Sequence, residues 1–268
     1  MKTKAGATAE GQQASRRPYR SPARQAQARR TRARILQAAT RAFCTHGYAG
    51  TTVAAVAAAA GVSVAAVELA FPTKPDLLKA AIDVAIAGDD EQVPVLERPW
   101  AATARAAPDA TAFLKAVTAV LVPTAVRSDA LILTALEAAR GDDRLVQLAA
   151  HLRAQRAVTA GWIVDGLRQR APLRPGVNRS EAIDIVWLLM DPAVFDRLTT
   201  ARHWPPDHFG RFFADSLLRL LTTPDTAPQI DAQQNNDRRT EPGHAPADPG
   251  SRSTRSTSRP QHPGNPRA

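Results

Sequence analysis

Between residues 30 and 222, apolar side chains recur at the three- and four-residue spacing of helices, and this pattern constrains the fold most strongly. Ile35, Leu36 and Phe43 show the spacing in the first such segment, and Gly47 is of the residue type that ends helices. Ala and Leu dominate, and no long segment alternates apolar with polar residues as strands do. The fold class is therefore all-α, and we expect Pro123 to kink or split its helix. The helices expected cover residues 30–45, 52–60, 64–70, 75–87, 109–127, 129–139, 142–170, 180–190, 192–201 and 206–222.

Both ends of the chain have the composition of disordered tails. Residues 1–28 show no apolar periodicity, and residues 225–268 contain seven Pro and no aromatic residue. Such segments bury too little apolar area to offset the entropy lost on ordering. We expect a disordered basic arm at 1–28 and a disordered tail at 225–268, with helical segments at 29–79 and 80–224 between them.

The positive charge is concentrated at the N-terminus. Residues 1–34 hold ten Lys and Arg against Glu10 alone, whereas residues 35–224 hold 19 basic and 19 acidic residues. A basic segment beside helices is typical of a nucleic-acid contact, and a solvated disordered leader is the alternative.

Several classes of protein are disfavoured by what the sequence lacks. The one Cys gives no intramolecular disulfide framework and fits a reducing compartment. No apolar run approaches the ~18 residues of a membrane span, and no apolar stretch of a signal peptide follows Lys2 and Lys4. We therefore expect a cytoplasmic protein with no membrane partner.

Two short helices joined at Gly61 are expected over residues 52–60 and 64–70. This is the geometry that places a second helix in the major groove of DNA, although a purely structural pair of helices gives the same pattern. Thr51 or Thr52 is expected to cap the first helix and Ser63 the second. Their N-terminal amides are suited to contact phosphates.

The residues of this segment resemble the DNA-binding segment of the TetR family of transcriptional regulators. The resemblance covers about fifty residues and rests on fixed offsets; it includes Ile35-Leu36-Gln37-Ala38-Ala39, Phe43, Gly47-Tyr48, Thr51-Thr52-Val53, Val56-Ala57, Ala60-Gly61-Val62-Ser63, Phe71, Lys74 and Leu77-Leu78. It implies a homodimer that binds a near-palindromic double-stranded DNA operator, usually as a repressor that a small-molecule effector releases. It also implies a helix-turn-helix DNA-binding domain at 29–79 and a helical ligand-binding and dimerisation domain at 80–224. Within the first of these it implies phosphate contacts from Thr52 and Lys74, and base contacts from Val64, Ala65 and Ala66. The full set of candidate DNA-binding residues is Arg29, Arg30, Arg32, Thr51, Thr52, Ser63, Val64, Ala65, Ala66, Glu68 and Lys74.

The expected recognition helix departs from that family, which usually has Tyr at the position of Glu68. The helix has no Arg, Lys, Asn or Gln for bidentate base readout, so direct readout is limited to apolar contacts with thymine methyls. Glu68 either accepts from a cytosine amino group or points away into a salt bridge, and the salt bridge is the favoured interpretation. We expect Arg29, Arg30 and Arg32 to supply the missing affinity from the minor groove or the flanking phosphates.

The larger segment has the residues for a ligand cavity and a dimer interface. An apolar effector is the default expectation, because the polar anchors are few. The candidate cavity residues are Phe113, Leu133, His151 and Trp162. The helices at 180–190 and 206–222 are strongly apolar, which indicates burial on two sides, in a dimer or in the core of a large monomer. The candidate dimer residues are Ile183, Val186, Trp187, Met190, Phe209, Phe213, Leu217 and Leu220.

An enzyme is the main rival, and the sequence does not favour it. There is no Gly-rich phosphate loop, no Gly-x-Ser-x-Gly turn and no Cys/His cluster with zinc spacing, so we expect no catalytic residues, metal or cofactor. A non-specific nucleic-acid-binding protein that uses both basic tails is the other rival. The neutral, apolar-rich segment at 80–224 argues against it, because such a protein needs no large helical body.

Overall fold

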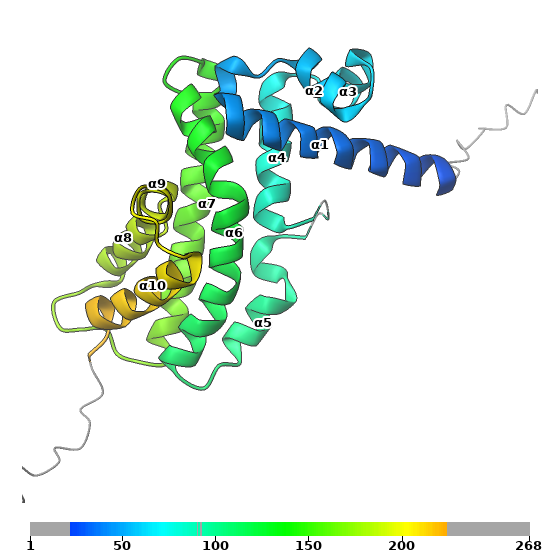
Figure 1. Cartoon of the computed structure of the whole chain (residues 1–268). Coiled ribbons are helices and arrows are strands. Elements are labelled where there is room, and N and C mark those ends of the chain that lie inside the picture. The colour runs from blue at the N-terminus through cyan, green and yellow to red at the C-terminus, as the bar shows by residue number, and fades with distance from the viewer. Residues whose placement is uncertain (1–21, 90, 92, 224–268) are drawn as a thin grey trace, which may run out of the picture. The chain divides into compact units, whose positions relative to one another are not determined.

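Ten α-helices form the part of the chain that the computed structural model describes, which is residues 22–89, 91 and 93–223 (Figure 1). No strand occurs within these ranges, and one isolated bridge joins Leu173 to Thr222. The all-α prediction is therefore confirmed. Residues 1–21 and 225–268, which hold most of the predicted disordered tails, lie outside the described residues.

The first helix is longer than the sequence analysis predicted. Helix α1 spans Pro22–Gly50, with a break at Gly47, whose φ of 67° and ψ of −177° are not helical. Residues 22–28 are therefore helical, and the prediction that the arm is disordered as far as residue 28 is wrong for them. The reason is that Ala, Arg and Gln are good helix formers, so a helix nucleated by the apolar residues after Thr31 extends backwards at little cost.

Three shorter helices follow and pack on α1: α2 (Val53–Ala60), α3 (Val64–Ala70) and α4 (Lys74–Ala87). Gly61 has a φ of 63° at the end of α2, a left-handed conformation that favours glycine, and it turns the chain toward α3. Ile35, Phe43, Val56 and Val67 meet in the core beneath this turn, where each is fully buried.

The rest of the described chain is a bundle around two long helices, α6 and α7 (Figure 1). Helix α6 contacts α1, α4, α5, α7, α9 and α10, so it is the central helix of the bundle. The elements are a 3-10 turn (Val95–Glu97), α5 (Pro99–Arg105), α6 (Ala110–Ala138), α7 (Asp143–Arg168), α8 (Arg179–Leu189), α9 (Pro192–Asp196), a π-helical turn (Arg197–Ala201) and α10 (Pro206–Leu221).

Pro123 does not split its helix. The helix also continues through residue 128, so the two helices expected at 109–127 and 129–139 are one. Helix α6 runs unbroken from Ala110 to Ala138. Proline's fixed φ is compatible with a helix, and buried residues before and after it, such as Val122 and Ala125, hold both halves against the same neighbours. By length and composition, α6 is the one described helix that passes a test for a membrane span, which core helices of soluble proteins also pass.

The buried apolar residues form two clusters, and the first is shared between the N-terminal helices and the bundle. Leu131 and Ala135 of α6 and Leu145 and Leu148 of α7 belong to the same cluster as the residues of α1 to α4. The second cluster joins α6, α7, α8, α9 and α10. The expected boundary between residues 79 and 80 therefore does not separate two cores, and the functional division at that point stays a prediction.

Candidate nucleic-acid interface and ligand cavity

Hydrogen-bonding side chains cap both helices of the helix-turn-helix. The Thr52 hydroxyl accepts from the Ala55 N–H at 3.1 Å at the start of α2, and the Ser63 hydroxyl accepts from the Ala66 N–H at 3.2 Å at the start of α3. Both caps are exposed, as a surface that meets DNA requires. They satisfy backbone amides that would otherwise have no partner.

Arg34 of α1 forms hydrogen bonds to the turn between α2 and α3. The sequence analysis did not identify this role of Arg34. Its guanidinium donates to the carbonyl oxygens of Ala60 and of Gly61, the latter at 3.2 Å. These carbonyls end α2 and lack helical partners, so the guanidinium fixes the angle at which the chain enters α3. The signal in the sequence is weak, because Arg34 looks like one more charge of the basic arm.

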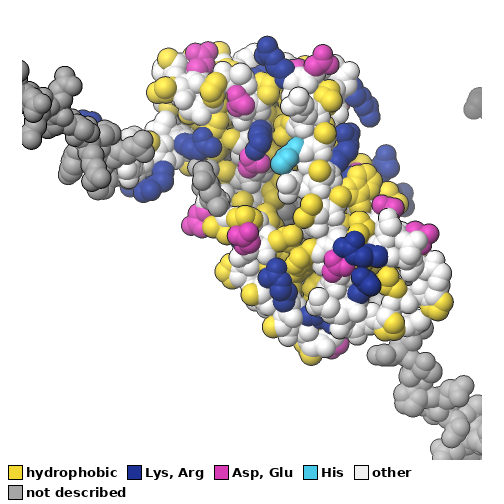
Figure 2. Space-filling model, turned by 180° about the vertical axis from the view of Figure 1, so that it is seen from behind, with side chains coloured by type: hydrophobic (Ala, Val, Ile, Leu, Met, Phe, Trp, Pro, Cys, Tyr) yellow, Lys and Arg dark blue, Asp and Glu magenta, His cyan; other side chains and the backbone are white. Residues whose placement is uncertain are grey.

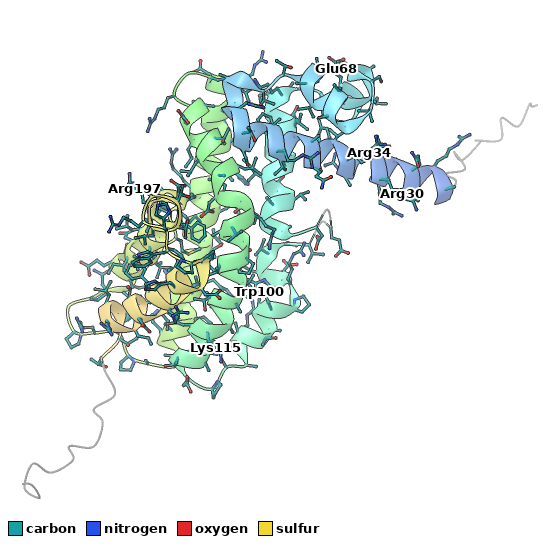
Figure 3. All side chains as sticks on the ribbon, in the orientation of Figure 1. Arg30, Arg34, Glu68, Trp100, Lys115 and Arg197 are labelled. Carbon is teal, nitrogen blue, oxygen red and sulfur yellow. The ribbon has the colours of Figure 1, made fainter. Side chains whose placement is uncertain are left out.

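The outer face of α3 is largely apolar. Val64, Ala65 and Glu68 are exposed and Ala66 is half-buried, whereas Val67 is buried against the core. Glu68 forms no ion pair with any described residue, so the salt bridge that the sequence analysis favoured is not present (Figure 3). Leu69 is 89% exposed, the largest value among the large hydrophobic residues, and the sequence analysis missed it. Its place opposite Val67 in the helical repeat was the available signal.

Two residues of the predicted DNA-binding set, Thr51 and Lys74, have other partners in the structure. The Thr51 side chain is buried and its hydroxyl donates to the Gly47 carbonyl oxygen at 2.8 Å, which contradicts its assignment as a DNA contact. The Lys74 ammonium lies 4.1 Å from the centre of the Tyr48 ring, and burial lowers its pKa. The Tyr48 hydroxyl in turn donates to Asp142 at 3.4 Å. Lys74 is half-buried and holds a cation-π contact on the side of the helix-turn-helix that meets the bundle.

The three arginines of the arm lie on helix α1 and differ in exposure. Arg29 and Arg30 are exposed, whereas the guanidinium of Arg32 lies over the Phe71 ring at 4.5 Å from its centre (Figure 3). Because Arg29 and Arg30 are carried by a helix, their distance from α3 is set by the fold. Arg32 instead contributes to packing beneath the recognition helix.

A cavity of about 840 Å³ lies between α4, α5, α6 and α7, with residues of α9 and α10 at its inner end. This size lies within the range of small-molecule sites. Of the four predicted residues, His151 lines this cavity. Phe113 and Trp162 are instead packed against each other at 5.6 Å in the second core cluster, and Leu133 lines a different, shallower pocket. Helical periodicity located apolar faces but did not show which of them leave space.

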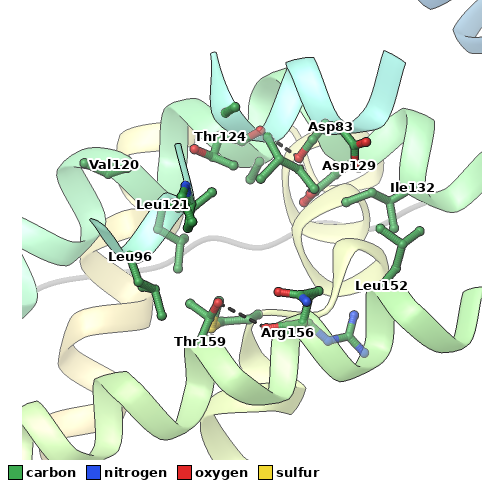
Figure 4. Close-up of a pocket in the computed structure, with 18 of the residues that line it drawn as sticks. Asp83, Leu96, Val120, Leu121, Thr124, Asp129, Ile132, Leu152, Arg156 and Thr159 are labelled. Carbon is green, nitrogen blue, oxygen red and sulfur yellow. Dashed lines mark hydrogen bonds between the residues drawn. The ribbon is translucent and has the colours of Figure 1, made fainter. Parts of the chain in front are cut away.

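The cavity wall is mostly apolar and carries a few charged side chains. Leu121, Ile132 and Leu152 are part of the lining, as is Trp100 (Figure 4). In Figure 2, hydrophobic side chains gather about halfway down the face shown. Asp129 on α6 also belongs to the lining, and burial raises its pKa to about 7.

Arg156 on α7 lines the cavity and is held from outside it. Its guanidinium forms an ion pair with Asp191 at 2.8 Å and lies over the Trp187 ring at 4.0 Å. Its Nε is buried without a hydrogen-bond partner among the described residues. Burial lowers the pKa of Arg156, and the carboxylate of Asp191 opposes that shift.

The predicted dimer residues divide into buried and accessible groups. Val186, Phe209, Phe213 and Leu217 are fully buried within the chain, which contradicts their assignment to a dimer interface. They face α6 and α7, because the most apolar face of each helix packs into its own core first. The remaining residues are half-buried or exposed; they are Ile183, Trp187, Met190 and Leu220.

A helix-turn-helix with a capped, exposed second helix is the arrangement with which many DNA-binding transcriptional regulators enter a major groove. A family model described as bacterial regulatory proteins of the tetR family matches residues 35–81. No curated protein matches the sequence. The match over residues 35–81 confirms the resemblance to the DNA-binding segment of the TetR family that the sequence shows.

Solved structures share the fold at low sequence identity. A putative TetR-family transcriptional regulator from Rhodococcus sp. is 15% identical, with a TM-score of 0.54 over 72% of this chain and 99% of that one. NalD, the secondary repressor of the MexAB-OprM multidrug efflux pump in Pseudomonas aeruginosa, is 20% identical, with a TM-score of 0.54 over 75% and 100%. A putative transcriptional regulator from Saccharomonospora viridis, solved in complex with choline, is 18% identical, with a TM-score of 0.54 over 72% and 97%.

Proposed function

We propose that the protein is a cytoplasmic, dimeric repressor that binds a near-palindromic operator and is released from it by a small, largely apolar ligand. The observation that carries the DNA-binding part is the exposed outer face of α3, held by the Ser63 cap and by the Arg34 contacts to the turn. A rigidly held short helix with one free face is the element that enters a major groove.

Base recognition in this proposal is apolar. Val64, Ala65 and Leu69 offer methyl groups that suit thymine methyls, and Glu68 is available to accept from a cytosine amino group. Phosphate contacts come from Thr52, from Arg29 and Arg30 on α1, and from Lys74 once it leaves the Tyr48 ring. Such phosphate contacts position the protein and supply salt-dependent affinity.

Dimerisation is assigned to the outward faces of α8 and α10. Leu188 is 58% exposed and Leu220 is 44% exposed, and the half-buried Ile183 and Trp187 belong to α8 as well. Apolar residues on two adjacent helices suit a four-helix interface between two copies. A dimer sets the separation of its two α3 helices, and half-sites of an operator match that separation.

Release by a ligand is assigned to α4, which joins the helix-turn-helix to the bundle. Ala80, Val84 and Ala87 of this helix line the cavity, while Leu77 and Leu78 are buried in the first core cluster. A ligand that binds one orientation of α4 more tightly shifts the two α3 helices away from their half-sites. NalD is described as a repressor, and the same role is proposed here.

The experiment is sequencing of genomic DNA fragments protected by the purified full chain. The proposal predicts a small set of promoter sites that contain an inverted repeat, with half-site centres about one helical turn apart. Substitution Leu69→Asp is expected to remove these footprints without changing the helical content of the protein. Protection spread evenly over the genome would support the rival non-specific role instead.

A further inference from the structure

Asp129 carries a half-buried carboxyl group in the lining of a largely apolar cavity. The Ser128 hydroxyl donates to it at 3.4 Å, and no ion pair of the described residues includes it. Burial of an ionised carboxylate without a counter-charge costs several kcal/mol. A side chain that lowers the stability of the fold in this way is a candidate ligand-binding residue.

The other buried or paired charges around the cavity are already neutralised. Asp83 accepts from Lys79 at 2.6 Å, and Asp89 accepts from Arg98 at 2.6 and 2.8 Å. Arg156 is balanced by Asp191, which lies behind it. Glu91 and Glu97 also belong to the lining, but both are exposed to solvent. Asp129 is therefore the half-buried carboxylate of this lining that has no ion pair among the described residues.

Arg156, on the side of the cavity opposite Asp129, does not offer an anion a better site than Asp129 offers a cation. Arg156 and Asp129 lie on facing helices, α7 and α6 (Figure 4). The guanidinium of Arg156 already has a carboxylate and an aromatic face as partners, which leaves one N–H, on Nε, without an acceptor. A ligand anion would have to compete with Asp191 for Arg156 and would be repelled by Asp129. A cation is attracted by Asp129 and faces an Arg156 charge that Asp191 already balances.

Aromatic rings complete a site for a positive charge. Trp100, Phe195 and Phe209 are part of the lining, and the Trp100 ring is fixed by its N–H, which donates to the Val95 carbonyl oxygen at 2.9 Å. Ring faces attract organic cations and also pack against alkyl groups. The cavity thus combines a largely apolar volume of about 840 Å³ with one half-buried carboxylate, that of Asp129, which no ion pair of the described residues includes.

We propose that the effector of this regulator is an amphiphilic organic cation, an apolar body with an amine or quaternary ammonium group, and that Asp129 binds the charged group. This inference rests on the proposed function, since it names the ligand class for the cavity of the proposed repressor. Asp129 is the specificity-determining residue, and the apolar lining holds the body of the ligand.

The test is calorimetric titration of the DNA-free full chain at pH 8 with three probes of equal chain length, used well below micellar concentrations. The probes are decyltrimethylammonium, the neutral N-decylacetamide and the anionic decanoate. The proposal predicts that the cation binds most tightly to the wild-type protein. It also predicts that Asp129→Asn weakens cation binding at least about tenfold and does not weaken binding of the neutral amide.

Asp83→Asn is the matched control, because Asp83 belongs to the same lining but is exposed and paired with Lys79. It is expected to change the cation Kd by less than about twofold. Equal cation binding by wild type and Asp129→Asn, tighter binding of decanoate, or no binding of any probe would each overturn the proposal. The ranking of probes on the wild-type chain does not depend on a variant folding. The titration contains no DNA, so it tests the ligand site separately from the repressor role. If the protein binds the cation but does not bind an operator specifically, the repressor role is contradicted and the ligand site is not.

Discussion

The Arg127 guanidinium donates through Nε to the Ala85 carbonyl oxygen at 3.0 Å, which ties the last turn of α4 to the middle of α6. Gly88 ends α4 three residues later with a φ of 88°. This contact joins the helix that leads to the DNA-binding segment to the helix that carries Asp129. Under the proposed function, a change in the cavity would reach the orientation of α4 through this contact.

Replacing Arg127 tests that transmission. Arg127→Met keeps the apolar stem and removes the hydrogen bond, so we expect the free energy of unfolding to fall by about 1 kcal/mol. Operator affinity without ligand should change little, whereas the loss of affinity caused by a bound cation should shrink. Arg140→Met, at an exposed arginine just after α6, is the control. Fluorescence anisotropy of labelled operator measures the operator affinity with and without decyltrimethylammonium. If the cation lowers the operator affinity of Arg127→Met as much as that of the wild type, Arg127 does not transmit the effect of the ligand.

Asp129 is expected to make stability depend on pH. Its pKa is about 7 in the folded chain against 3.8 for the free side chain, so the folded state binds this proton more tightly. Stability from Asp129 is therefore largest at low pH and is lost as the pH rises from about 4 to about 7. Beyond burial, Asp191 and Asp196 raise this pKa, while Ser128 and Arg156 lower it.

Asp129→Asn should consequently stabilise the protein at pH 8 by roughly 2 to 4 kcal/mol, and by less at pH 5. Urea unfolding of the full chain at the two pH values measures this difference. His151, which also lines the cavity, is present in both proteins and cancels in the comparison. A variant that is less stable than wild type at pH 8 would show that Asp129 is held in the fold as a favourable partner.

The basic residues of α1 are expected to set the salt dependence of DNA binding. Arg29→Gln with Arg30→Gln removes two charges and keeps good helix formers, so the helix should remain. Each phosphate that is no longer neutralised should lower the slope of log K against log salt concentration by about 0.9. Arg211→Gln with Arg219→Gln, on exposed positions of α10, removes the same charge from the bundle and should leave the slope unchanged. Equal slopes for both double variants would exclude the arm contact.

Replacing each of two glycines of α7, Gly161 and Gly166, by alanine should have opposite effects on the stability of the protein. A Cβ on Gly166 would lie 2.2 Å from the Phe113 ring, which is fully buried, whereas a Cβ on Gly161 would lie 3.7 Å from the nearest side-chain atom. Gly166→Ala should therefore cost about 1 to 3 kcal/mol through overpacking. Gly161→Ala should be neutral or stabilise by up to about 1 kcal/mol through helix propensity. Thermal unfolding of the two variants checks the contrast.

The sequence predicted local structure well where periodicity and capping residues agree. Gly61 and Ser63 marked the turn and the start of α3, because a left-handed glycine and a capping hydroxyl act within a few residues. Pro123 misled because tertiary packing on both sides of it outweighs its local preference for ending helices. The prediction of disorder over residues 22–28 was wrong because a helix that is already nucleated can extend through residues that have no apolar face.

The site was less predictable, since periodicity shows which faces are apolar but not what covers them. Val186, Phe209 and Phe213 have the apolar character of interface residues and are buried in the chain's own core. Asp129 gave no signal in the sequence, because an acidic residue on a helix is ordinarily solvated. Its importance comes from the cavity that α4, α5 and α7 build around it, which no local pattern encodes.

Competition binding tests the central claim most directly. The purified full chain is bound to a labelled fragment carrying its best footprint, and unlabelled bulk DNA and unlabelled copies of the same fragment are compared as competitors at physiological salt. The account predicts a preference for the footprint of at least about 10³. Equal competition by the two DNAs would contradict the assignment of a sequence-specific regulator.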